Sequence, residues 1–294
     1  MTVKAATANY QAITSIALKL KGPAPVKKSY EHYQYIKIEK QNRIAVVTLN
    51  RPEYRNALHM EAHAELEQLW LDLAQDEEVY AIVLTGAGKT FSAGGDIKRM
   101  VERAGTVEGL QYSLRIPAAT KRLLQNILDV PQPIIAAVNG DAVGLGATLA
   151  LFGDVAIIAE TAKFGDTHTK VGLVAGDGGT VIWPLLMGPA RAKEFLMRGL
   201  IVDGAEAGRR NLVNYAVPTE EVLPKAMAMA AELAELPIWA VRWTKLSVNK
   251  WIKEQLNAIL DASIAFEMLS MNTHDHGEAA RAFLEKRKPD FKGY

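Results

Sequence analysis

The chain has 294 residues, of which 49% are hydrophobic and 23% charged, and 34 basic against 33 acidic residues give a net charge of +1. This balance argues against a protein that binds nucleic acid or an anionic membrane through bulk electrostatics. Because the sequence contains no cysteine, disulfides, thiolate nucleophiles and cysteine metal sites are excluded, which fits a reducing compartment. No apolar run reaches the ~18 residues that span a bilayer. We therefore expect a cytoplasmic protein that does not cross a membrane.

The N-terminal segment differs in composition from the rest of the chain. Its first 30 residues carry five lysines but no arginine, aspartate or glutamate, and a Gly-Pro-Ala-Pro break at 22–25 divides them. Lysines without acidic residues are also found in targeting peptides, but the missing arginine and the break favour a mobile extension over residues 1–30, followed by one domain over 31–294.

Strands and helices alternate through the first two thirds of that domain. Apolar periodicity predicts strands at 35–39, 44–49, 80–85, 134–138 and 155–159, and helices at 60–74, 110–129 and 145–152. After Gly178 the pattern becomes almost wholly helical, with helices predicted at 179–187, 190–198, 220–235, 238–253 and 255–270. No internal repeat or long linker divides the chain. We expect an α/β core to about residue 200 and a helical region over 201–294.

Two glycine-rich turns each follow an apolar, strand-like run. The first is FSAGGDIK at 91–98 and the second is NGDAVGLG at 139–146. Glycine allows a backbone to turn sharply and to present its N–H groups to a ligand oxygen. Two such donors aimed at one oxygen would make an oxyanion hole.

These turns belong to an ordered set of motifs that runs along most of the chain. LNRP at 49–52, NAL at 56–58, LTG at 84–86, VGL at 171–173 and AF at 282–283 accompany them in order. From about residue 35 to 293 the sequence resembles the crotonase (enoyl-CoA hydratase/isomerase) superfamily. The resemblance implies a crotonase ββα-spiral core with a C-terminal helical trimerisation region, assembled as a homotrimer or a dimer of trimers. It also implies an acyl-CoA substrate, no further cofactor, and an oxyanion hole formed by the amides of Gly95 and Leu145.

The resemblance further implies a site for the CoA portion of the substrate. CoA presents phosphates, an adenine and a pantetheine arm, so its site needs cations at one end and backbone hydrogen bonds along the rest. The matching positions here, which we expect to contact substrate or CoA, are Arg55, Ala93, Asp96, Ile97, Lys98, Phe283 and Lys286.

The sequence departs from the family at the two positions where hydratases carry catalytic glutamates. These positions hold Thr148 and His168. A threonine hydroxyl has no pKa near neutrality and does not replace a carboxylate as a base, so the standard two-glutamate hydration mechanism is not supported. Asp177 lies nine residues after His168. An aspartate there resembles the dienoyl-CoA isomerases, and the His/Asp pair, followed by Trp183-Pro184, resembles the oxocamphor-hydrolase-like enzymes.

Three functions therefore remain open. The first is an acyl-CoA enzyme that acts through a thioester enolate: Asp177 can shift a double bond, His168 and Asp177 together can cleave a carbon–carbon bond in a β-ketoacyl-CoA, and hydration also stays open. The second is a β-diketone hydrolase that does not use CoA. The third is a non-catalytic or RNA-binding homologue, which would be expected to carry a dense basic stripe.

Structural roles compete with each of these assignments. Asp177 precedes two glycines and is also a good helix N-cap, and His168 can be a structural histidine in a polar turn. Glu267 lies near the C-terminal helices and could reach a neighbouring active site in an oligomer. The adjacent spacing of His274, Asp275 and His276 does not put three ligands on one helix face, so no metal is expected.

Overall fold

The computed structural model describes residues 28–294 of the chain, and these residues form two β-sheets surrounded by helices. The larger sheet has the strand order β1-β2-β3-β5-β7-β10, and the smaller sheet has the order β4-β6-β8-β9. The large sheet consists of Ile36–Gln41 (β1), Ile44–Leu49 (β2), Ala81–Gly86 (β3), Ile134–Val138 (β5), Val155–Ala159 (β7) and Tyr215–Val217 (β10). The small sheet consists of Thr90–Ser92 (β4), Asp141–Val143 (β6), Lys163–Gly165 (β8) and Ile201–Asp203 (β9).

The chain alternates between the two sheets. Strands β3, β5 and β7 pair in parallel, and each is followed directly by a short strand of the small sheet, β4, β6 and β8 respectively. Those three short strands are parallel as well. This repeated strand–strand–helix order is the ββα arrangement expected from the sequence. Its consequence is that equivalent turns, one after each short strand, lie side by side.

The central strands of the large sheet are buried on both faces. Every residue of β3 (AIVLTG) and β5 (IIAAV) is buried, as near-continuous apolar runs in parallel sheets require. Helix α9 packs across β3, β5 and β7. The largest fully buried side chains include Trp70, Phe91 and Trp183, so the core is continuous from the large sheet into the small one.

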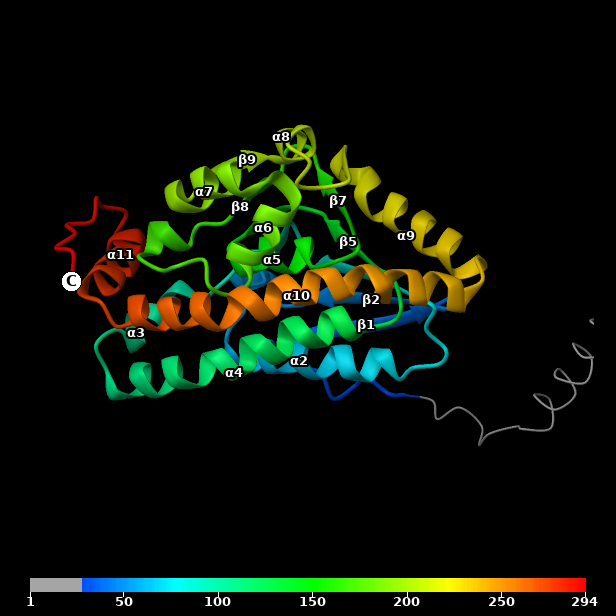
Figure 1. Ribbon diagram of the computed structural model, residues 1–294, viewed down its shortest axis with the longest axis horizontal. Helices are drawn as coiled ribbons and strands as arrows, with labels where there is room; N and C mark the ends of the chain where they lie inside the picture. The colour runs from blue at the N-terminus through cyan, green and yellow to red at the C-terminus, as the bar shows by residue number, and fades with distance from the viewer. Residues whose placement is uncertain (1–27) are drawn as a thin grey trace, which may run out of the picture.

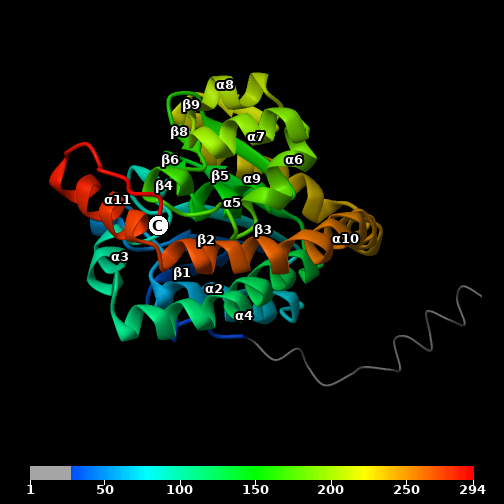
Figure 2. The same ribbon diagram turned by 60° about the vertical axis from the view of Figure 1, so that its left-hand side comes forward.

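Helices form the remaining layers, and α4 packs between α2 and α10 (Figures 1 and 2). The helices of the first half are Pro52–Tyr54 (η1), Met60–Ala74 (α2), Ile97–Arg103 (α3), Val107–Asp129 (α4), Leu145–Leu151 (α5) and His168–Val171 (η2). Those of the second half are Gly179–Met187 (α6), Pro189–Arg198 (α7), Gly204–Arg209 (α8), Thr219–Glu235 (α9), Ile238–Met271 (α10) and His274–Glu285 (α11). None of these helices combines the length and the apolar composition needed to cross a bilayer.

Several elements differ from the sequence prediction. Helix α10 is one helix rather than two, because Lys253, Glu254 and Gln255 at the predicted break all favour a helix. The region after Gly178 also contains two strands, β9 and β10, whose three residues are too few to produce an alternating pattern. The short strands β4, β6 and β8 were missed for the same reason.

The last three residues of the predicted mobile extension, 28–30, are ordered instead, because two of them bind to α2 and to the turn that follows it. Lys28 Nζ donates to Asp72 at 3.2 Å, and the Tyr30 hydroxyl donates to Asp76 at 2.7 Å. The extension was predicted over residues 1–30, of which residues 1–27 lie outside the described part of the chain.

Candidate active site

Three parallel strands of the small sheet end at the same place. In the sheet register Ser92 of β4 pairs with Ala142 of β6, and Val143 of β6 pairs with Gly165 of β8. Because neighbouring parallel strands point the same way, the segments that follow them gather at one edge of the sheet. These segments contain the two glycine-rich turns and the loop that carries His168. The topology thus brings together residues more than seventy positions apart in the sequence.

The first turn is held by Asn56, which has a positive φ of 54°. Its side-chain amide donates to the carbonyls of Ala87 at 2.9 Å and Thr90 at 2.7 Å. The amide of Leu58 donates to the carbonyl of Gly94 at 2.8 Å. These bonds explain why the NAL motif at 56–58 accompanies the turn: it fixes the backbone path just before Gly95.

The two glycine-rich turns pack directly against each other. Gly94 has a φ of +77°, and a Cβ on this residue would lie 2.5 Å from the Val143 carbonyl oxygen and 3.4 Å from the Leu145 nitrogen. A side chain is therefore excluded both by the backbone conformation and by the space. The amides of Gly95 and Leu145 border one cavity, and neither donates to a carbonyl in the turns and loops of residues 28–294. Two free N–H groups beside one cavity are what an oxyanion hole needs.

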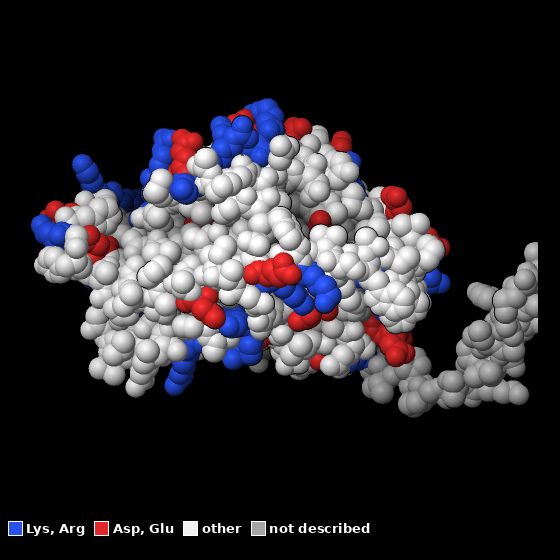
Figure 3. Space-filling view, viewed as in Figure 1, with Lys and Arg blue, Asp and Glu red and all other residues white. Residues whose placement is uncertain are grey.

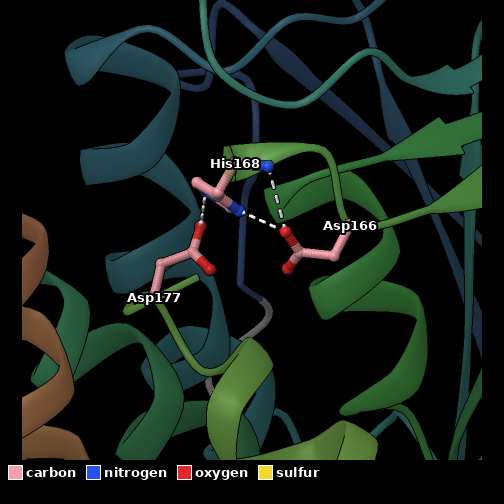
Figure 4. Close-up of side chains that lie close together, drawn as sticks. All are labelled: Asp166, His168 and Asp177. Atoms are coloured by element: carbon pink, nitrogen blue, oxygen red, sulfur yellow. Dashed lines mark hydrogen bonds and ion pairs between the residues drawn. The ribbon is translucent and has the colours of Figure 1, made fainter. Parts of the chain in front are cut away.

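A second group in the same place consists of Asp166, His168 and Asp177 (Figure 4). His168 Nδ1 lies 2.7 Å from Asp166 Oδ1, and His168 Nε2 lies 3.2 Å from Asp177 Oδ2. Asp166 also accepts a hydrogen bond from the backbone amide of His168 at 3.1 Å. The ring is thus held between two carboxylates, one at each nitrogen.

Both carboxylates act on the charge of the ring. Burial alone would lower the pKa of His168, but the charges and hydrogen bonds of Asp166 and Asp177 outweigh burial and hold this pKa well above its ordinary value. Near neutral pH the ring is therefore an imidazolium, with both nitrogens donating.

Asp177 faces the cavity and does not cap the following helix. The N-cap of α6 is Gly178, with a φ of 109°, and no side chain makes the capping hydrogen bond there. Asp177 is 6% exposed, and its Oδ1 is buried without a hydrogen-bond partner in the described chain. The structural alternative for Asp177, a helix cap, is thus not what the fold uses.

Glu267 of α10 completes the group of acidic side chains. It lines the same cavity as Asp177 in its own chain, rather than reaching toward a neighbouring subunit. Burial, reinforced by the negative charge of Asp177, raises the pKa of Glu267 to about 8. Its Oε2 has no hydrogen-bond partner among the described residues. The site therefore holds a carboxyl group, Glu267, that keeps its proton at neutral pH, in the same cavity as the Asp177 carboxyl group that contacts His168.

All these groups border a cavity of about 570 Å³, a size that suits a small-molecule ligand. The amides of Gly95 and Leu145, His168, Asp177 and Glu267 form one end. From there the cavity extends between α2 and α4, where the lining residues include Met60, His63, Ala64, Glu67, Arg115, Ala118, Ala119 and Arg122. Beyond the acidic end, the wall combines Met60 and three alanines with His63, Glu67 and two arginines.

Comparison with known proteins identifies the family. The enoyl-CoA hydratase/isomerase family model matches residues 39–294. The chain belongs to the enoyl-CoA hydratase/isomerase family. It is 34% identical over 259 residues to a probable enoyl-CoA hydratase of Mycobacterium bovis, covering 88% of this chain and 98% of that protein. It is 33% identical to the 1,2-epoxyphenylacetyl-CoA isomerase of Escherichia coli, covering 88% and 99% of the two chains.

A solved structure shows the same fold. The crystal structure of an enoyl-CoA hydratase/isomerase from Mycobacterium paratuberculosis superimposes with a TM-score of 0.80 at 32% identity, covering 86% of this chain and 99% of that one. The predicted crotonase fold is confirmed. Since the relatives include both a hydratase and an isomerase, the residues of this chain must decide between reactions.

The first glutamate position of the hydratases lies outside the cavity of this family member. Thr148 is fully buried in α5, and its methyl group would lie 3.2 Å from a Cβ on Gly178. Its hydroxyl has no hydrogen-bond partner in the part of the chain that the structure describes. Thr148 thus packs beneath the segment that carries Asp177 and leaves the proton-transfer positions to other residues.

The expected CoA-binding residues fall into two groups. Arg55 is held near the first turn, because its carbonyl accepts from the amide of Ala93 at 2.9 Å and its guanidinium pairs with Asp141 at 2.8 Å. Asp96 is the N-cap of α3 and accepts from the Arg99 amide. The other group lies on α3 and α11, which pack together at one end of the molecule (Figures 1 and 2). It comprises Ile97, which is partly buried, and the exposed side chains of Lys98, Phe283 and Lys286.

The cluster of Asp166, His168 and Asp177 also has the side-chain types of a metal site. As folded, however, the two carboxylates lie at opposite nitrogens of the ring. One ion cannot bind both nitrogens of one imidazole. The geometry therefore suits a hydrogen-bonded chain better than a metal centre, and the absence of a metal stays a prediction.

Sequence reasoning missed Asp166 and left Glu267 undecided. The Asp-x-His spacing at 166–168 puts the carboxylate within reach of both the backbone amide and the ring of His168. Glu267 continues the buried stripe of α10 formed by Leu256, Leu260 and Ile264. A glutamate at a helical core position is the signal that would have identified it.

Proposed function

We propose that the protein catalyses proton transfer on an acyl-CoA thioester through an enolate, with Asp177 as the base. The observation that carries this proposal is the shared cavity. It brings the free amides of Gly95 and Leu145 together with Asp177, which contacts His168, and with Glu267, whose raised pKa keeps its carboxyl group protonated at neutral pH. A pair of acidic groups in opposite protonation states is typical of acid–base catalysis.

In the proposed step the two amides hold the thioester carbonyl oxygen. Asp177 takes a proton from a carbon conjugated with the carbonyl, the C–H bond breaks, and its electron pair moves to the oxygen as the enolate forms. Glu267 then gives its proton to another carbon of the conjugated system, and the double bond moves. The proton on Asp177 returns to Glu267 directly or through water, which restores both groups. The net reaction is an isomerisation of an unsaturated acyl-CoA.

His168 is in this proposal a positioning residue. Its two hydrogen bonds fix the ring, and its positive charge favours the ionised form of Asp177. His168 occupies the position that carries the second glutamate in hydratases, and in this proposal it supports Asp177 as the base.

A second candidate is hydrolysis of a β-diketone or of a carbon–carbon bond in a β-ketoacyl-CoA. It is favoured by the direct contact of His168 with Asp177 and by Asp166, which orients the ring as a carboxylate orients a catalytic histidine. It requires a neutral imidazole that accepts a proton from water, whereas the raised pKa of His168 favours the cation. A non-catalytic or RNA-binding role ranks third, because a net charge of +1 offers no general attraction to RNA.

The proposal includes CoA contacts and an assembly. Arg55, Lys98 and Lys286 would bind the phosphates, Phe283 the adenine end, and the backbone from Ala93 to Ile97 the pantetheine arm. The functional unit would be a cytoplasmic homotrimer or dimer of trimers. Apolar side chains exposed on α4 and α10, including Leu114 at 71% and Leu269 at 68% exposure, support such contacts.

The test is a substrate panel with the wild-type protein and His168→Gln. The panel consists of crotonyl-CoA, a dienoyl-CoA and a cyclic β-ketoacyl-CoA. We expect the dienoyl-CoA to be isomerised, and His168→Gln to retain part of this turnover because Asp177 keeps its carboxylate. Cleavage of the β-ketoacyl-CoA, together with a loss of about 10²- to 10⁴-fold in His168→Gln, would instead support the hydrolase. No turnover of any member would contradict the proposed function.

A further inference from the structure

His63 of α2 has no role in the proton transfer described above, yet it lines the cavity. It lies beyond the acidic end, where the cavity runs between α2 and α4. Asp177, Glu67 and Arg122, which line the same cavity, all act electrostatically on its ring. His63 therefore lies near both the reacting group Asp177 and the Glu67–Arg122 pair.

The ring of His63 makes no hydrogen bond to another residue of the described chain. Burial lowers its pKa, and the charges of Glu67 and Asp177 oppose this only in part. The imidazole is thus neutral near pH 7, with one nitrogen that donates and one that accepts. The side chain is only partly buried, so its ring can bind a ligand group or water in the cavity.

The surroundings of His63 indicate which kind of ligand group its ring would bind. Ala64, Ala118 and Ala119 make this part of the wall small and apolar, as an acyl chain requires. Glu67 and Arg122 pair with each other, with Arg122 Nη2 3.3 Å from Glu67 Oε2. Their charges are therefore largely satisfied, and His63 is left as a neutral hydrogen-bonding group along the path of the acyl chain.

We propose that His63 binds an oxygen atom carried by the acyl group beyond its third carbon. The substrate class would then be an acyl-CoA with a distal keto or hydroxyl group rather than a plain hydrocarbon chain. A neutral imidazole can bind either group, since it donates a hydrogen bond to a keto oxygen and can also accept one from a hydroxyl. This inference rests on the proposed function, because the reacting carbons must lie beside Asp177 for the chain to pass His63.

The test compares binding of hexanoyl-CoA with binding of 4-oxohexanoyl-CoA, 5-oxohexanoyl-CoA and 5-hydroxyhexanoyl-CoA by titration calorimetry. None of these four needs to react. We expect the wild-type protein to prefer at least one oxygenated ligand by about 10-fold, as one hydrogen bond to an otherwise unpaired group provides. His63→Leu should abolish this preference, and His63→Gln, which keeps a donor and an acceptor, should retain part of it. His32→Leu, at an exposed histidine that does not line this cavity, is the matched control and should leave the preference unchanged.

The outcomes separate this inference from the function on which it rests. Equal affinity for all four ligands in the wild-type protein would overturn the role of His63. A preference that persists in His63→Leu, with an unchanged melting temperature, would overturn it as well. If His63→Leu does not fold, the His63→Gln variant and the comparison of ligands in the wild-type protein still test the role of His63. Failure to bind any acyl-CoA would instead contradict the proposed function itself.

Discussion

Replacing Glu267 by glutamine keeps the size of the side chain and removes the carboxyl group that the cavity holds protonated. In the unfolded chain glutamate titrates near its ordinary value of 4.5, whereas burial and the charge of Asp177 raise the pKa of Glu267 to about 8 in the folded protein. Between these two values the unfolded chain releases a proton that the folded protein keeps. The free energy of unfolding of the wild-type protein therefore falls as the pH rises from about 4.5 to about 8.

The size of this effect follows from the same two values. At pH 7 about 2.5 pH units separate the solution from the unfolded-state pKa, which corresponds to on the order of 3 kcal/mol. Glutamine does not titrate, so Glu267→Gln should be more stable than the wild-type protein by this amount at pH 7, and by about 1 kcal/mol or less at pH 5. The variant should at the same time lose turnover, because it has no proton to donate.

Urea unfolding at pH 5, 6, 7 and 8, at one protein concentration, measures the difference. Glu254→Gln, on the exposed side of the same helix, is the control and should show no such trend. If the stability gain of Glu267→Gln does not grow with pH, or if the variant is less stable than the wild-type protein at pH 7, then Glu267 is not held protonated and the acid–base pairing is wrong.

Three further predictions follow from the site and the surface. Turnover should fall as the pH rises through about 8, because Glu267 then loses the proton that it donates; a rate unchanged from pH 7 to 10 would count against this role. Lys98→Ala and Lys286→Ala should each weaken CoA binding by about 2- to 5-fold, an effect that disappears at high salt, whereas Lys193→Ala on α7 should not. Light scattering at micromolar concentration should give a trimer or a hexamer, because apolar side chains are exposed on α4 and α10 and few charged side chains cover the lower left part of the face in Figure 3; a monomeric mass would refute the assembly.

The turns and the family could be predicted from sequence because their signal is local. A position with a positive φ and no room for a Cβ, such as Gly94, requires glycine. That glycine can be recognised in the sequence without knowledge of the rest of the fold. The same holds for the long apolar strands β3 and β5, which must be buried on both faces.

The acid–base chemistry could not be predicted in the same way. Asp177 and Glu267 are ninety residues apart, and the raised pKa of Glu267 arises from its burial and from the charge of Asp177. His168 was a candidate base from its ordinary pKa, and only its position between two carboxylates indicates a cation. Such coupling depends on distances between segments that no local pattern encodes.

The central claim is that Asp177 transfers the substrate proton in the cavity, and the most direct measurement is the turnover of the acyl-CoA that the wild-type protein converts, made on Asp177→Asn. Asparagine keeps the shape of the side chain and one oxygen for His168, so folding and CoA affinity should change little. The rate should fall by about 10²- to 10⁴-fold, the usual contribution of a general base. Asp129→Asn, at the exposed end of α4, should retain wild-type turnover. Near-normal turnover in Asp177→Asn, with an unchanged melting temperature, would contradict the assignment of the site.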